Sequence, residues 1–186
     1  MAISCDILTA GLSSYACSSN AAGTNNIWLT NIDNLSALTI ASASTTPTVT
    51  ALSLTGSTKF YAMNPYQFTA EFQITNQRSE FGNNTYTPVV RFRCNQVTTA
   101  VMQTAYKMTR GKLAAIVKLN SGIYILAGVD DTTTPTNSLG LVSSKADLLS
   151  GIKSSDFMGY DFELAGGAGT YPIEVASSII ASITSN

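Results

Sequence analysis

The sequence of 186 residues contains no histidine. Histidine is the side chain whose ordinary pKa lies nearest neutrality, and it is the usual base that activates a serine or cysteine nucleophile. It is also a common zinc ligand. Its absence excludes the common Ser-His-Asp and Cys-His arrangements and any metal site built on imidazole. We therefore expect no enzymatic activity, no metal and no cofactor.

Charged residues are also scarce, because they make up 11% of the chain against roughly 25% in an average soluble domain. The net charge of −1 gives no overall attraction to nucleic acid. A surface with few charges resists self-association poorly. Composition alone leaves two interpretations open: a secreted β-protein, or a subunit whose surface is mostly covered in an assembly.

Cysteine occurs three times, at Cys5, Cys17 and Cys94, without the spacing of a metal site. Cys5 and Cys17 either form a disulfide or stay reduced in a protein assembled in a cytoplasm. Cys94 falls on an apolar strand face, where a free thiol behaves as a small hydrophobic residue. No apolar run approaches the roughly 20 residues that span a bilayer, so we expect no membrane insertion.

Hydrophobic residues make up 45% of the chain, and its length suits one domain with a proper core. Residues 1–24 are small and polar, and we interpret them as an N-terminal arm or loop. Residues 25–186 show no repeat and no linker, which predicts a single β domain.

The most informative pattern is a side-chain period of two in two long stretches, Tyr66–Thr75 and Tyr86–Cys94. Apolar and polar residues alternate there, which predicts two strands that each have one buried and one wet face. Both stretches exceed the usual strand of roughly five or six residues. Strands of this kind suit a large wall or barrel. The polar-face residues are Gln67, Thr69, Glu71, Gln73 and Thr75 on the first stretch and Arg91 and Arg93 on the second.

The period changes to three and four residues in Gln96–Thr109, which predicts an amphipathic helix with Asn95 as its N-cap and Gly111 at its end. Lys145–Ser150 is interpreted as a helical turn. The other predicted strands are Asn26–Ile32, Leu35–Ala41, Val49–Thr55, Phe60–Met63, Leu113–Leu119, Ile123–Val129, Phe157–Leu164 and Ile173–Ile180. The predicted class is mostly β (α+β) with one packed helix.

Acidic residues offer one candidate for chemistry. Asp161 and Glu163 share a strand face and are a candidate glycosidase pair, but such pairs usually come from separate elements that flank the bond. A single solvated face is the simpler interpretation. Glu71 lies on the wet face of the first long strand and Arg91 and Arg93 on that of the second, which predicts cross-strand charge pairs.

Three segments together carry a resemblance to a known family: Gly23–Leu35, Leu113–Gly128, and Gly159–Gly166 followed by Pro172–Val175. In this order, with the predicted helix before the second segment, the chain resembles the tail tube-like structural proteins of tailed bacteriophages. The resemblance covers most of the chain from Gly23 onward. It implies a β-sandwich or partly closed barrel with one flanking α-helix.

Subunits of that family associate into rings, commonly hexameric, whose strands join into an inner β-barrel, and stacked rings form a tube for DNA. The resemblance therefore implies a virion protein of the tail, assembled in the bacterial host cytoplasm. Its partners would be copies of itself, other tail proteins and DNA in transient, non-specific passage. The long strands would form the inner wall, with their polar face on the lumen or at a subunit contact.

The segment between the two long strands would reach a neighbouring ring. Its residues are Asn76, Gln77, Arg78, Ser79, Glu80, Phe81, Gly82, Asn83 and Asn84. Channel lumens in the family tend to be acidic, whereas Arg91 and Arg93 lie on the predicted wet face. One interpretation is that the two arginines form intersubunit salt bridges with Glu71 or Glu80. The residues do not separate a tube subunit from a ring, terminator or connector protein. The alternative function is a carbohydrate- or cell-surface-binding module of a fibre or adhesin, in which Trp28 and tyrosine residues stack on sugars.

Overall fold

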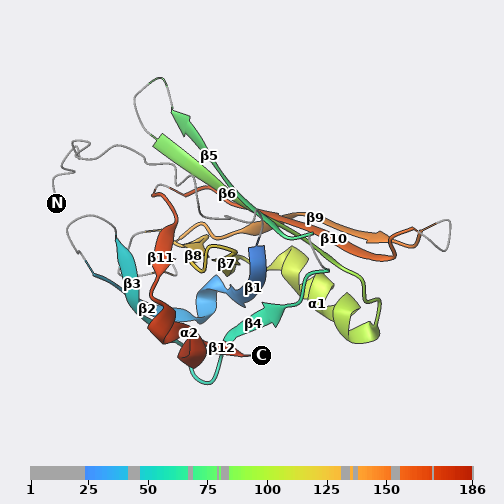
Figure 1. Ribbon diagram of the computed structural model, residues 1–186, viewed down its shortest axis with the longest axis horizontal. Coiled ribbons are helices and arrows are strands. Elements are labelled where there is room, and N and C mark those ends of the chain that lie inside the picture. Colours follow the sequence, from blue (N-terminus) through green and yellow to red (C-terminus); the bar gives the residue numbers. More distant parts are fainter. Residues whose placement is uncertain are drawn as a thin grey trace.

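The computed structural model describes residues 24–41, 47–66, 69–78, 80, 84–130, 135, 138–151, 156–168 and 170–185. These residues form a curled eight-stranded sheet, a four-stranded sheet and two α-helices (Figure 1). The expected class, a mostly β sandwich or partial barrel with a flanking helix, is confirmed. The proposed N-terminal arm lies outside the described residues except for Thr24, which begins the first strand.

The larger sheet has the strand order β12-β4-β1-β7-β8-β11-β3-β2. Its pairs are antiparallel except β11 with β3 and β12 with β4, which are parallel. A short 3-10 turn, Ile32–Asn34, connects β1 to β2. The strands are β1 (Thr24–Asn31), β2 (Leu35–Ala41), β3 (Thr48–Leu54), β4 (Phe60–Met63), β7 (Leu113–Leu119), β8 (Tyr124–Ala127), β11 (Ile173–Val175) and β12 (Thr184–Ser185).

The smaller sheet is antiparallel throughout and has the order β5-β6-β10-β9. In Figure 1 it runs across the upper part of the molecule, with the β5–β6 hairpin at one end and the β9–β10 hairpin at the other. The strands are β5 (Glu71–Arg78), β6 (Asn84–Cys94), β9 (Val142–Leu149) and β10 (Gly159–Ala165). Leu141 and Leu113 exchange two backbone hydrogen bonds, which fasten the start of β9 to the start of β7.

The apolar run at the start of β7 explains how the two sheets share a core. Successive strand residues point to opposite faces, and both faces of β7 are covered. Ala114 and Ile116 belong to a cluster on one side of the larger sheet, closed by the C-terminal helix. Leu113, Ala115 and Val117 belong to a second cluster between the two sheets. The apolar face of β6 and β10 completes this second cluster with Val90, Phe92, Tyr160, Phe162 and Leu164.

Helix α1 (Thr99–Arg110) lies against β9 and buries Ala105 and Met108 in the core between the sheets (Figure 1). The predicted helix is confirmed, but its start is three residues later than expected. The Thr98 hydroxyl accepts a hydrogen bond from the Val101 N–H at 3.3 Å, so Thr98 and not Asn95 is the N-cap. The helix ends at Gly111 as expected.

The C-terminal prediction is partly wrong. The expected strand Ile173–Ile180 ends at Val175, and the chain continues as helix α2 (Ser177–Ile183). Ile180 and Ile183 are buried against the larger sheet. Their spacing of three residues matches the period of a helix. A single apolar run this short does not distinguish a strand from a buried helix.

Two further predictions are corrected in the smaller sheet. The strand expected from Tyr66 begins only at Glu71, because the N–H and the hydroxyl of Thr69 donate to the Tyr66 carbonyl at 3.1 and 2.6 Å and form a turn. Phe68 of this segment lies outside the described residues. The helical turn expected at Lys145–Ser150 is the strand β9, which ends at Leu149. Of the helices that the structure describes, none is long and apolar enough to cross a bilayer.

Candidate functional site

The face of the four-stranded sheet opposite the core carries a network of ion pairs. Its centre is Arg91 on β6, which lies in register with Glu71 on β5 and with Glu163 on β10. The distance from Arg91 Nη1 to Glu71 Oε2 is 3.3 Å, and that from Arg91 Nε to Glu163 Oε2 is 2.6 Å. The Ser144 hydroxyl on β9 donates to Glu163 Oε1 at 2.9 Å. One row of side chains therefore links all four strands.

A second group lies beside this row, around Asp161 on β10. Lys145 Nζ on β9 is 2.8 Å from Asp161 Oδ2, and Arg93 Nη2 on β6 is 3.5 Å from the same oxygen. Lys145 also lies 3.7 Å from Asp147 on its own strand. The guanidinium of Arg93 sits 5.5 Å above the centre of the Phe157 ring, a cation–π distance. Each of the three cations of this face thus has a carboxylate partner.

These contacts shift the pKa values of the paired groups. The hydrogen bond from Arg91, followed by that from Ser144, lowers the pKa of Glu163 below its ordinary value. Burial raises the pKa of Asp161, but the hydrogen bonds from Lys145 and Arg93 outweigh it, and the pKa is lowered. Hydrogen bonds to Glu163 and then Glu71 raise the pKa of Arg91. The hydrogen bond to Asp161 raises that of Lys145.

The lowered pKa values argue against a glycosidase pair. A general acid needs a raised pKa so that it still holds its proton near neutral pH, whereas Asp161 and Glu163 are both held ionised by cations. The simpler interpretation, one solvated face, is confirmed by the ion pairs. Among the described residues, no group of three or more His, Cys, Asp or Glu could hold a metal ion.

Most of the predicted polar face is where the sequence places it. Glu71, Gln73 and Thr75 are exposed on one face of β5, and the Glu71–Arg91 cross-strand pair is confirmed. Thr69 precedes the strand, and its hydroxyl accepts from the Arg93 N–H at 3.4 Å.

Two further predictions concern Gln67 and the partners of the two arginines. Gln67 lies outside the described residues. Within the chain Arg91 pairs with Glu71 and Glu163, and Arg93 pairs with Asp161. The intersubunit salt bridges considered for the two arginines stay a prediction.

Most of the described residues of the expected loop between the two long strands belong to strands. Asn76, Gln77 and Arg78 extend β5, and Asn84 begins β6 and pairs with Arg78, so the loop prediction was wrong for these four residues. Glu80 lies in an exposed turn between them. The remaining loop residues, Ser79, Phe81, Gly82 and Asn83, lie outside the described residues. The result is a long two-stranded hairpin that extends away from the core (Figure 1).

Sequence reasoning missed the contribution of β9. Lys145 and Asp147 lie on the charged face, while Ala146 between them packs toward the core. This alternation is a period-two signal, and it could have identified the strand. The signal was obscured by the leucines that follow, Leu148 and Leu149, which are both exposed.

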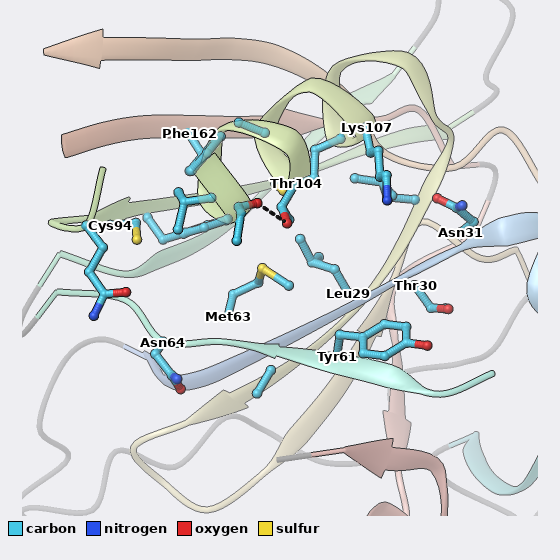
Figure 2. Close-up of a pocket in the computed structure, with 18 of the residues that line it drawn as sticks. Leu29, Thr30, Asn31, Tyr61, Met63, Asn64, Cys94, Thr104, Lys107 and Phe162 are labelled. Atoms are coloured by element: carbon cyan, nitrogen blue, oxygen red, sulfur yellow. Dashed lines mark hydrogen bonds between the residues drawn. The ribbon is translucent and has the colours of Figure 1, made fainter. Parts of the chain in front are cut away.

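A cavity of about 780 Å³ lies between α1 and the strands β1, β4 and β6. Figure 2 shows Leu29 and Met63 side chains directed into this space and Thr104 on the helix above it. Lys107 is the charged residue among those that line the cavity. The lining therefore offers no acid–base pair, and we assign it no chemistry.

Trp28, one of the aromatic residues considered for the sugar-binding alternative, is 7% exposed and packs in the first core cluster. It cannot stack on a ligand at the surface. Comparison with protein-family models, with curated proteins and with solved structures found no match. Function must therefore be inferred from the geometry of this chain.

Proposed function

We propose that the protein is a structural component of a virion, a subunit of a phage tail tube or tail ring. Its copies join edge to edge through the four-stranded sheet and enclose a channel for DNA. The observation that carries this proposal is that β5 and β9 form the two edges of that sheet, with no further strand beside them among the described residues. Such edges present rows of unpaired N–H and C=O groups, which are templates for pairing with another chain.

The directions of the strands support closure into a ring. All three pairs of the sheet are antiparallel, so β5 and β9 run in opposite directions. When copies are related by rotation, β9 of one copy meets β5 of the next as another antiparallel pair. Every added copy then continues the same pattern. A head-to-tail contact of this kind closes into a ring or continues as a filament.

The two edges also carry apolar side chains that association would bury. Val142, Leu148 and Leu149 are exposed on β9, and Phe72 and Ile74 are only half-buried on β5. Burial of apolar surface contributes about 25 cal/mol per Å². An exposed edge with apolar residues promotes aggregation unless a specific partner covers it.

The charged face suits the wall of a DNA channel. DNA binds proteins chiefly through lysine and arginine side chains that neutralise its phosphates. On this face Arg91, Arg93 and Lys145 are each within 4.0 Å of a carboxylate. The carboxylates that pair with them are Glu71, Asp147, Asp161 and Glu163, one more than the cations. A wall of this composition allows transient passage of DNA without tight binding.

Electron microscopy and sedimentation of the purified protein test the proposal. We expect rings of one symmetry, or tubes made of stacked rings. Leu148→Lys on β9 should abolish them, because a charge would then stand at the edge that pairs. Ile123→Lys, at a similarly exposed apolar residue outside the four-stranded sheet (43% against 49% exposed), should leave them intact. A protein that stays monomeric at high concentration would refute the proposal.

A further inference from the structure

The outer face of the four-stranded sheet carries a row of charges that alternates in sign. Glu71 pairs in register with Arg91, Arg91 with Glu163, and Glu163 with Lys145. The row therefore begins with a negative charge on the β5 edge and ends with a positive charge on the β9 edge. Within the chain Glu71 pairs with Arg91 and Lys145 pairs with Asp161, yet the side chain of Glu71 is still 57% exposed and that of Lys145 is 42% exposed. Each end residue therefore has an accessible side for a further partner of opposite charge.

We infer that Lys145 of one copy and Glu71 of the next form a salt bridge that aligns neighbouring subunits of the ring. The inference rests on the proposed ring and specifies which surfaces meet and in which register. A second copy of this chain occupies the β9 edge, because the charges at the two edges are complementary.

The row of charges distinguishes head-to-tail contact from a two-fold contact. In a two-fold dimer through β9, Lys145 would approach Lys145 of the other copy, because it lies near the middle of the strand. Like charges placed against each other across an interface are unfavourable and exclude wrong arrangements. In a two-fold dimer that paired the whole of β5, Glu71 would lie at the far end of the partner strand, where the residue on its face is the uncharged Gln77. Only the contact of β9 with β5 continues the alternation, and this is the contact that forms rings.

The charges also restrict the register between the two strands. Glu71 is the one acidic residue of β5, and the other residues on its face, Gln73 and Thr75, are uncharged. A slip that moved Glu71 toward Asp147 would place two carboxylates together. Closure of a sheet requires a stagger between strands. The stagger can place Lys145 of one copy diagonally across from Glu71 of the next copy instead of directly opposite it. Diagonal neighbours are about 7–8 Å apart, which long side chains can span.

Charge reversal with mixing tests the inference. Glu71→Lys alone and Lys145→Glu alone each place like charges at every contact, and we expect loss of rings in both. An equimolar mixture of the two variants should recover rings, because contacts between unlike copies again join opposite charges. The double variant E71K/K145E should also form rings. Asp33→Lys and Lys59→Glu are matched reversals at exposed sites outside this sheet and should change nothing.

A second measurement needs no variant and so does not depend on whether the variants fold. A zero-length carbodiimide reagent couples an amine to a carboxylate that it contacts, and mass spectrometry identifies the joined peptides. Within one chain β6 and β10 separate β5 from β9, which is three strand spacings of about 4.8 Å. Coupling of Lys145 to Glu71 therefore reports a contact between copies. Coupling of Lys145 to Asp161, 2.8 Å away in the same chain, is the internal control.

The outcomes separate the two proposals. Rings that couple Lys145 to Glu71 and are lost in the single reversals support the inference. Rings that couple Lys145 to Asp161 but not to Glu71, or that persist in both single reversals, overturn the inference and leave the ring itself standing. Wild-type protein without rings overturns the proposed function and the inference together.

Discussion

Arg91 Nε lies 2.6 Å from Glu163 Oε2 across the β6–β10 pair, while Nη1 of the same side chain lies 3.3 Å from Glu71 Oε2 on β5. One side chain thus connects both strands of the β5–β6 hairpin to β10, which comes from a distant part of the sequence. Arginine suits this position because its planar group donates in several directions at once. The connection lies on the solvated face, where ion pairs contribute little to stability each and more as a network.

This network predicts how stability depends on acid. The pKa values of Glu163 and Asp161 are lowered in the folded protein, so the unfolded chain binds more protons at low pH. The stability contributed by these two carboxylates is present above their unfolded pKa values, about 3.9 for aspartate and about 4.3 for glutamate. It is lost as the pH falls through the folded pKa values. We expect the free energy of unfolding, measured with urea at a series of pH values, to decline below about pH 5.

Glu163→Gln should make that decline shallower, because the variant has one carboxylate fewer to protonate. Glu80→Gln is the control, since this exposed turn residue has no ion pair among the described residues. An acid profile of Glu163→Gln identical to that of the wild type would show that the Arg91 contact is absent in solution.

The part of this site that lies within one hairpin was predictable from the sequence. Alternation placed Glu71 and Arg91 on the same face, and a hairpin brings its own two strands together. The partner Glu163 lies 72 residues from Arg91, and no local pattern states that β10 pairs with β6. Lys145 was missed for a different reason, because the alternation around Ala146 is short and the leucines that follow it on edge strand β9 are exposed.

The aromatic core between the sheets predicts a large effect of Phe92. This residue is buried and packs on Phe162 with 5.1 Å between ring centres. Phe92→Ala should lower the free energy of unfolding by about 3–5 kcal/mol, because it removes buried surface and leaves a cavity. Tyr106→Ala, on the exposed side of α1, should change it by no more than about 0.5 kcal/mol. Equal effects in chemical denaturation would contradict the placement of Phe92 in the core.

The N-cap of α1 in the structure is a different residue from the one that the sequence pattern predicts. Thr98→Ala removes the hydroxyl that accepts from the Val101 N–H and should cost about 1 kcal/mol. Asn95→Ala alters the N-cap expected from the sequence, three residues earlier, where the chain is not yet helical. It should have almost no effect on the thermal midpoint. A larger loss of stability from Asn95→Ala than from Thr98→Ala would show that the helix begins at the earlier position.

The two adjacent glycines after β10 should respond differently to the same substitution. A Cβ on Gly166 would collide with the backbone carbonyl oxygen of Gly140, which has no flexible end that could move aside. Gly166 also donates its N–H to the Pro88 carbonyl at 3.2 Å, so a shift would disturb the end of the β6–β10 pair. A Cβ on Gly167 would meet only the Leu139 side chain, at an ordinary contact distance of 3.7 Å.

Gly166→Ala should therefore lower the free energy of unfolding by about 1–3 kcal/mol, the usual cost of forcing extra atoms into a packed site. Gly167→Ala should stay within about 0.5 kcal/mol of the wild type. Both substitutions add the same methyl group and restrict the unfolded chain alike, so their difference measures the close approach of Gly166 to Gly140 alone. Equal stabilities of the two variants in urea would mean that the loop before β9 does not lie against the end of β10.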